Sequence, residues 1–366
     1  MKRKGRLKKV LKLTVSFVLV VTAAVCIGKR LPETFGNREA VLAAAAFTLT
    51  DGKYPIESGT APESTSYEQE TTEETAAPTQ QSAAVQAMPK QRDKSGYYDT
   101  NADHSGEEAY DITEKTIIGS GTEVDGCYIK NYAGMDLDFE GILSSPLSFS
   151  VDPASDKPQV LIYHTHTGES YIDEDTDRFY ESYYSRTNNN DFNVVAVGEA
   201  ITETLEKNGI KTLHDTTVHD STYNGSYDRS AQTVTDDMKK YPSIKVALDI
   251  HRDALGTDTC KVKTVFEYNG KKGAQIMILS GCDPENERGF TNWQNNLSFA
   301  LKLQNTAEKL YPGMTRPLNF DYFAYNEYIC DGSLLIEIGT DANSIDEAEY
   351  TGRLLANVLS KVLAGG

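Results

Sequence analysis

Basic residues are scarce in this chain outside its first 30 residues. The 366 residues include 36 Lys and Arg against 54 Asp and Glu, which gives a formal net charge of -18. Nine of the bases fall within residues 1–30, so residues 31–366 carry 27 bases against all 54 acids. Nucleic-acid binding depends on clustered Lys and Arg that neutralise phosphates. The deficit therefore argues against nucleic acid as a partner, and against a body that lies on anionic lipid.

Cysteine is too sparse to support a fold or a metal site built on sulfur. Beyond residue 30 the chain has four cysteines, spread between Cys127 and Cys330. Such a spread makes no disulfide framework, and the absence of any CxxC or CxxH pair argues against a thiolate zinc site. No GxSxG motif occurs either, so a Ser-His-Asp hydrolase is a poor interpretation.

One long hydrophobic run follows the N-terminal bases. Residues 10–28 contain a single charge, Lys12, and a helix of about 20 apolar residues spans a bilayer. Because flanking bases stay on the cytoplasmic side, we predict that residues 1–30 are a cytoplasmic tip and a transmembrane anchor. A cleaved signal peptide is the alternative, but no small-x-small site closes the run. We therefore expect a single-pass protein of the cell membrane whose C-terminal domain is extracytoplasmic.

Two segments of different composition separate the anchor from the main domain. Residues 31–108 are predicted to be a disordered tether, because the stretch 57–86 is rich in Ser, Thr, Glu, Ala, Pro and Gln. A segment with so few large aliphatic side chains cannot offset its ordering entropy by burial. Residues 109–156 contain short strand-like runs split by Gly and Asp, and we interpret them as a small leading element.

Residues 157–366 alternate between strand and helix patterns. Residues 160–163 are a continuously apolar run typical of a buried parallel strand, and the mainly apolar runs 244–250 and 334–338 are predicted to be further strands. Between them, apolar residues recur at helical spacing. This alternation predicts a three-layer α/β domain with a mostly parallel sheet flanked by helices.

Three of the predicted strands carry residues that can bind a metal. His164 and His166 follow the first strand, and His251 follows the second. Glu337 lies inside the last strand, where a carboxylate costs desolvation energy unless it has a partner. The carboxyl ends of strands are where ligands bind in open α/β sheets. Each residue alone has an ordinary structural interpretation, but their joint placement favours one site.

This residue set predicts zinc. Imidazole and carboxylate suit Zn²⁺, and a catalytic zinc has about three protein ligands plus a water. Two histidines and one carboxylate would supply the ligands, and a further Glu would act as a base toward the metal-bound water. Arg252 is predicted to stabilise an oxyanion, and Asp253 to orient a ligand. The remaining histidines, His104, His214 and His219, are interpreted as structural or solvated.

Two groups of aromatic residues leave two interpretations open. Tyr180, Tyr183 and Tyr184 form one group, and residues 322–328 contain the other. Either group could wall a groove for a sugar or a peptide, or could pack within ordinary loops.

Three motifs, taken in order, resemble the stage II sporulation protein P family. They are Val-Leu-Ile-Tyr-His-Thr-His-Thr-Gly-Glu-Ser-Tyr at 160–171, Asp-Ile-His-Arg-Asp-Ala at 249–254 and Leu-Ile-Glu-Ile-Gly at 335–339. Residues 191–198 also look like the opening of the family's first helix. The match covers about residues 110–366, and the predicted anchor and tether fit the family's layout.

The resemblance implies a peptidoglycan hydrolase of endospore-forming bacteria, related to the zinc-dependent N-acetylmuramoyl-L-alanine amidases. Members of the family remove stem peptides from glycan strands and are also credited with cutting peptide cross-links as endopeptidases. They act during engulfment alongside stage II sporulation proteins D and M. The implied partners are peptidoglycan, these two proteins and the membrane. The alternative is a non-catalytic wall-binding or scaffold protein that keeps the fold.

The resemblance also implies roles for individual residues. In the related amidases a His after the first strand, a Glu at the start of the first helix and a His at a later strand end bind zinc. Alignment of the first strands places His166, and not His164, at the first ligand. His251 then matches the second His, and Glu337 matches the Glu that does acid–base work.

The third zinc ligand stays open at this point. The region where the related amidases have their intermediate Glu contains Asn188, Asn189 and Asn190. Glu169 and His164 are therefore candidates for the third ligand, and Asp191 is a weaker one.

Overall fold

The computed structural model describes residues 92–365, which belong to one compact unit of the chain. The strands are β1 (Ala109–Lys115), β2 (Thr122–Val124), β3 (Cys127–Asn131), β4 (Val160–Tyr163), β5 (Arg178–Tyr180), β6 (Thr212–His214), β7 (Val246–Asp253), β8 (Gly256–Thr257), β9 (Cys260–Tyr268), β10 (Lys271–Ala274), β11 (Ile276–Gly281), β12 (Leu318–Asp321) and β13 (Gly332–Thr340). The helices are α3 (Phe139–Ser144), α4 (Val194–Lys207), α5 (Ser226–Lys240), α6 (Trp293–Leu310), α7 (Ile345–Ala364) and the short 3-10 helix η2 (Glu327–Ile329).

The predicted transmembrane anchor and most of the predicted tether lie outside the described residues. Within residues 92–365, no helix has both the length and the apolar character needed to cross a bilayer.

An eight-stranded sheet forms the centre of the domain. Its strand order is β2-β3-β12-β11-β13-β7-β4-β6, and the neighbours β13, β7, β4 and β6 run parallel. The three apolar runs expected to be strands are β4, β7 and β13, so this part of the prediction is confirmed. Since the three strands are parallel, their carboxyl ends meet at one edge of the sheet.

The expectation of a mostly parallel sheet is wrong, because the strand pairing is mixed. β11 lies antiparallel to β13, and β2 lies antiparallel to β3. A second sheet has the order β10-β9-β1-β5, with β8 paired to β9, and contains only one parallel pair, β1 with β9. An apolar run indicates that a strand is buried, but it does not indicate whether the strand is parallel or antiparallel to its neighbours.

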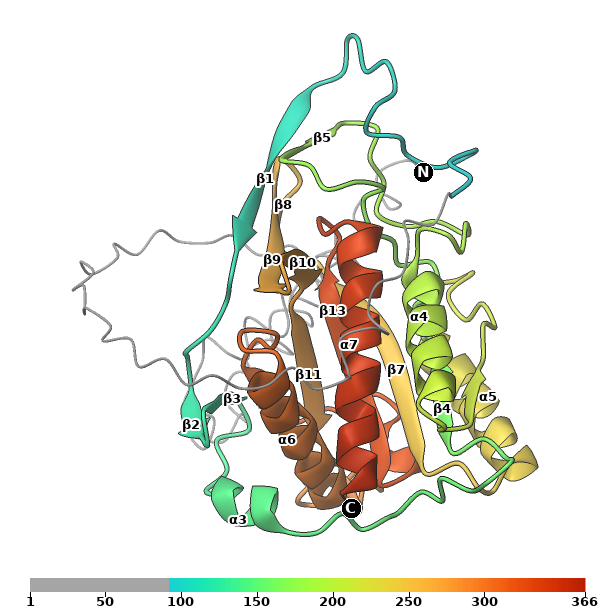
Figure 1. Cartoon of the computed structure of the whole chain (residues 1–366), viewed down its shortest axis with the longest axis vertical. Coiled ribbons are helices and arrows are strands. Elements are labelled where there is room, and N and C mark those ends of the chain that lie inside the picture. Colours follow the sequence, from blue (N-terminus) through green and yellow to red (C-terminus); the bar gives the residue numbers. More distant parts are fainter. Residues whose placement is uncertain (1–91, 366) are drawn as a thin grey trace, which may run out of the picture. The chain divides into compact units, whose positions relative to one another are not determined.

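Helices cover both faces of the large sheet. Alternate residues of β4 point in opposite directions: Val160 and Ile162 join the main core with α4, α6 and α7, whereas Leu161 and Tyr163 pack beside α5. Figure 1 shows α4, α6 and α7 side by side across the strands. The predicted helix–sheet–helix layering is therefore present, and α5 covers the face on which the candidate site lies.

Local capping explains where the two long helices nearest the site begin. Ser344 and Glu347 form a reciprocal capping box at the start of α7. The Asn193 side chain accepts a hydrogen bond from the Val195 N–H at the start of α4.

Residues 109–156 do not form a separate leading element, because their strands join both sheets. β1 pairs with β9 and β5, while β3 pairs with β12 and extends the large sheet. These partners lie far away in the sequence, so no local pattern could indicate them.

Residues 92–108, which we expected to belong to a disordered tether, form a strap that packs against the domain. Arg92 donates to Asp346 at 2.6 Å and to Glu349 at 3.0 Å, both on α7. Lys94 adds further ion pairs to the loop after β4. The prediction is wrong for these residues because buried rings and charge pairs offset the cost of ordering.

Removing the Tyr97 ring is expected to destabilise the domain. The ring stacks on Phe192 with 4.5 Å between centroids, and its hydroxyl donates to the Tyr171 carbonyl. Tyr97→Ala loses both contacts and should lower the free energy of unfolding by about 3 kcal/mol in a urea titration. Tyr97→Phe keeps the stack and should cost only about 1 kcal/mol. An unchanged urea midpoint for Tyr97→Ala would contradict a packed strap.

Candidate active site

The candidate site lies at the carboxyl ends of β4, β7 and β13. His251 on β7 is directly opposite Glu337 on β13 in the parallel register. The neighbours Leu248 and Ile250 belong to the main core, so the alternation of the strand directs Asp249 and His251 to the face that α5 covers. The sequence pattern alone places these polar side chains together on one face.

His166 reaches this face from the loop after β4. Its ring centre is 5.3 Å from that of His251, and the two planes are nearly perpendicular at 87°. Tyr223 stacks on its outer side with 4.7 Å between centroids. Nδ1 of His166 is buried with no hydrogen-bond partner among the described residues. Burial also lowers the pKa of His166 to about 4, which keeps the ring neutral with a lone pair available to a ligand.

His251 lies between two carboxylates. Its Nδ1 is 3.2 Å from Oε2 of Glu169, and its Nε2 is 2.9 Å from Oδ1 of Asp249. Nε2 has no hydrogen-bond partner among the described residues. Burial disfavours the charged ring, but the charges of Asp249 and Glu169 outweigh it and raise the pKa of His251 well above its usual range. The surroundings of this imidazole therefore strongly favour positive charge.

Glu169 is held in place by the backbone around it. Its carbonyl accepts the Val194 N–H at 2.9 Å, which ties the residue to the first turn of α4. Its Oε2 accepts the backbone N–H of Arg252 at 3.3 Å. Burial opposes ionisation, yet the neighbouring charge of His251 lowers the pKa of Glu169 below its usual range. Glu169 is thus a buried carboxylate beside the start of the first long helix.

Glu337 is a half-buried acid whose pKa lies above its usual range. Burial, followed by the charge of Asp253, raises its pKa to about 8. Its Oε2 has no hydrogen-bond partner among the described residues. A carboxyl group with such a pKa can both accept and release a proton close to neutrality, which is the property that general acid–base catalysis needs.

The donor set fits zinc, and two of the three donors are already spaced for it. Tetrahedral zinc with bonds of about 2.0–2.2 Å holds neighbouring ligand atoms roughly 3.4 Å apart. Nδ1 of His251 and Oε2 of Glu169 are 3.2 Å apart. The unpartnered Nδ1 of His166 is the third donor, but within residues 92–365 these atoms do not all lie within 4.8 Å of one another. A side-chain adjustment at His166 would complete the set.

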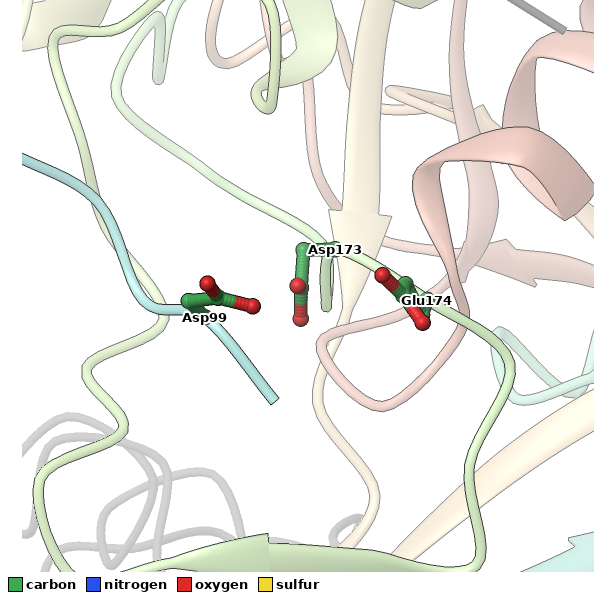
Figure 2. A group of neighbouring side chains, drawn as sticks. All are labelled: Asp99, Asp173 and Glu174. Carbon is green, nitrogen blue, oxygen red and sulfur yellow. The ribbon is translucent and has the colours of Figure 1, made fainter. Parts of the chain in front are cut away.

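Another acidic group does meet that distance criterion, but a lysine fills it. Figure 2 shows Asp173 between Asp99 and Glu174. The Lys94 ammonium lies 2.9 Å from Asp99, 2.6 Å from Asp173 and 2.7 Å from Glu174. The three acids therefore neutralise a cation of the strap, and we interpret the group as structural.

His164 lies away from the site, on the α4 side of the sheet. Its Nδ1 is 3.0 Å from the Ile250 carbonyl, and its Nε2 is 3.0 Å from Nε2 of His214. A Cβ at Gly198 of α4 would lie only 2.7 Å from that Nε2, so the helix backbone packs directly on the ring. The structure thus separates the two histidines and does not support His164 as a metal ligand. Asp191, the weaker candidate, lies in the turn before α4.

The contacts of Arg252 favour a structural role over the predicted oxyanion stabilisation. Its guanidinium donates to the backbone carbonyls of Ser170 at 3.1 Å, Ser185 at 2.6 Å and Asp253 at 3.4 Å. The bond to Ser170 fixes the loop that carries Glu169. Asp253 also has another partner, because its carboxylate accepts from Arg316 at 2.7 Å.

Asp249, and not Asp253, is the carboxylate that flanks His251, and sequence reasoning missed it. It accepts the Thr165 N–H at 2.8 Å and the Thr165 hydroxyl at 2.5 Å. The signal was present in the sequence, because an Asp two residues before His251 in a buried strand shares its face. The position of Tyr223 and Tyr227 against His166 had no comparable signal, since both follow a long loop.

Comparisons with known proteins agree on one family. The model of the family "Stage II sporulation protein P (SpoIIP)" matches residues 33–360. Stage II sporulation protein P of Bacillus subtilis (strain 168) is 28% identical over 226 residues, which cover 57% of this chain and 51% of that protein. The chain therefore spans about half the length of this curated relative.

Solved amidase structures show a remote likeness. N-acetylmuramoyl-L-alanine amidase AmiC2 of Nostoc punctiforme is 12% identical with a TM-score of 0.31, over 58% of this chain and 98% of that one. The CwlD amidase from Clostridioides difficile, solved in complex with the GerS lipoprotein, is 12% identical with a TM-score of 0.34, over 57% of this chain and 100% of that one. These values are too low to support an argument about activity.

Substitution of His166 and of His164 should affect different properties, zinc affinity in the first case and stability in the second. His166→Ala removes an unpartnered donor and should weaken zinc affinity more than about 100-fold, measured by competition with a chromogenic chelator. His164→Ala removes a buried hydrogen-bonded ring and should cost roughly 1–3 kcal/mol of unfolding free energy, with zinc affinity nearly unchanged. If His164→Ala abolished zinc binding in a protein that stays folded, the assignment of the two histidines would be reversed.

Proposed function

The chain belongs to the stage II sporulation protein P family, and on that premise we propose that it is a zinc-dependent peptidoglycan amidase that acts in sporulation. The bond cleaved would be the amide between N-acetylmuramic acid and the first residue of the stem peptide. One observation carries the proposal: His166, Glu169, His251 and Glu337 converge on one face at the ends of three parallel strands. They are a neutral imidazole, a carboxylate, a second imidazole and an acid that titrates near neutrality.

Three of these residues would hold the metal. His166, Glu169 and His251 supply two nitrogen donors and one oxygen donor, a set that catalytic zinc sites use. When bound there, Zn²⁺ supplies a Lewis acid that polarises the amide carbonyl and lowers the pKa of its water. Asp249 lies at Nε2 of His251, where a carboxylate orients the ring and raises its basicity as a ligand.

Glu337 would transfer the proton. Its Oε2 has no hydrogen-bond partner in the part of the chain that the structure describes, and its pKa of about 8 lies near the working pH. The carboxylate would accept a proton from the attacking water and then donate it to the nitrogen of the leaving stem peptide. The low dielectric of this buried face strengthens each of these charge interactions.

The observation that favoured a non-catalytic wall-binding protein no longer does so. That alternative depended on the absence of a Glu at the start of the first helix, where the chain has asparagines. Glu169 lies beside the first turn of α4 and 3.2 Å from His251, so a carboxylate reaches this place from another loop. We therefore favour the enzyme, and we also propose the cutting of peptide cross-links as a second activity of the same site.

The family membership also supports proposals for the location and the partners of the protein. We propose that residues 10–28 anchor the protein in the cell membrane, since eight bases flank this apolar run within residues 1–30. The domain would then meet peptidoglycan outside the cytoplasm during engulfment. Stage II sporulation proteins D and M are the proposed protein partners.

Glu337→Gln should leave zinc in place and slow the reaction. Loss of a general acid–base group typically costs 10²–10⁴-fold in rate, so we expect about this decrease in the release of stem peptides from purified sacculi. Glu203→Gln, on an exposed part of α4, is the matched control and should digest sacculi like the parent. Mass spectrometry of the products distinguishes free stem peptides from cleaved cross-links.

Two outcomes would contradict the proposal. One is an equal rate of digestion by the parent and by Glu337→Gln when both contain zinc. The other is a parent protein that binds one equivalent of zinc and releases no soluble product from sacculi.

A further inference from the structure

The two aromatic groups of the sequence have different places in the structure. Tyr183 is buried and its hydroxyl donates to the Asp341 carbonyl at 2.6 Å, while Tyr180 stacks on His104 of the strap. These rings hold the strap to the domain. The second group, in residues 322–328, lies beside the candidate active site and has no role in the chemistry described above.

A continuous series of rings connects this second group to the two histidines. Phe323 is 4.7 Å from Tyr325, and Tyr325 is 5.3 Å from Tyr227 of α5, measured between ring centres. Tyr227 in turn is 5.6 Å from His166 and 6.4 Å from His251. We call Tyr227, Phe323 and Tyr325 the aromatic shelf. All three rings are half-buried, so each keeps part of its surface for a ligand.

The backbone that presents Tyr325 is strained and firmly held. Tyr325 and Asn326 both have positive φ, at 32° and 64°, a conformation that residues other than glycine seldom adopt. The buried Asn326 amide donates to the Tyr227 carbonyl at 3.2 Å and to the Ser230 hydroxyl at 2.9 Å. Since strain of this kind persists where the surroundings fix it and commonly marks functional sites, the turn is built to hold Tyr325 over α5.

The shelf itself carries no charge. Burial, followed by the charges of Glu337, Glu327 and Asp321, raises the pKa of Tyr325 to about 12. The phenol therefore stays neutral near pH 7. On the other side of His166, Arg186 lies 3.0 Å from Asp220, 4.0 Å from Glu169 and over the Tyr223 ring. The shelf therefore suits an uncharged ligand, whereas the Arg186 side carries charged groups of both signs.

We propose that the aromatic shelf is the subsite for an uncharged sugar ring of the glycan strand. A pyranose ring has an apolar C–H face that packs on an aromatic face, while its hydroxyls stay in water. N-acetylglucosamine is neutral, and the muramic acid carboxyl is consumed in the amide to the stem. The stem peptide would then leave the site on the Arg186 side. This inference rests on the proposed function, because it orients that substrate across the same site.

The test measures binding of a neutral sugar without catalysis. The full-length chain carrying Glu337→Gln is titrated with chitotetraose, an uncharged oligomer of N-acetylglucosamine, and separately with a free stem tripeptide. We expect Tyr325→Ala to weaken chitotetraose binding about tenfold or more, and Tyr325→Phe to keep it. Tyr132→Ala, which removes an exposed tyrosine beside β3, is the matched control and should bind like the parent.

A second variant controls for misfolding of Tyr325→Ala. Tyr325→Gly removes the ring at a position whose positive φ glycine adopts freely, so it should fold and bind as weakly as Tyr325→Ala. Equal binding of chitotetraose by the parent and by Tyr325→Gly would overturn the inference. So would a loss of tripeptide binding with sugar binding intact.

The subsite and the amidase activity can fail independently. Sugar binding that depends on Tyr325, in a chain that digests no sacculi, would keep the subsite and reject the proposed function. Digestion of sacculi, with sugar binding that ignores Tyr325, would do the reverse.

Discussion

The placement of His251 between the carboxylates of Asp249 and Glu169 is the interaction on which the rest of the site depends. Two buried carboxylates beside one imidazole create a strongly negative electrostatic potential inside the protein. A proton or a metal ion is needed to compensate that charge. Thr165 holds Asp249 with two hydrogen bonds, and it belongs to the loop that also carries His166 and Glu169. One loop after β4 therefore carries two of the three proposed ligands and holds the carboxylate that orients the third.

The parts of the fold around this loop act mainly to keep it rigid. Arg252 donates to its backbone at Ser170 and to the Ser185 carbonyl between β5 and α4, and Tyr97 of the strap packs against Phe192 just before α4. A guanidinium that could have served the reaction is thus used to fix the geometry of a carboxylate ligand. This arrangement agrees with the general need of metal sites for an outer set of contacts that restricts the ligands.

Period-two alternation made the centre of the fold and half of the site predictable from sequence. The apolar runs identified β4, β7 and β13, and the polar residues His251 and Glu337 within or after them indicated a shared edge. His164 and His166 differ by two residues in a loop, where alternation no longer holds, so only the structure separates them. The antiparallel pairing of β11 and the packing of the strap depend on residues distant in sequence, which local patterns do not report.

The most direct test of this account is X-ray absorption spectroscopy at the zinc edge on the full-length chain loaded with one equivalent of Zn²⁺. The account predicts a first shell of two imidazole nitrogens and oxygen donors, with one imidazole lost in His166→Ala and none lost in His164→Ala. A shell of oxygens alone, as the group Asp99, Asp173 and Glu174 would give, would contradict it.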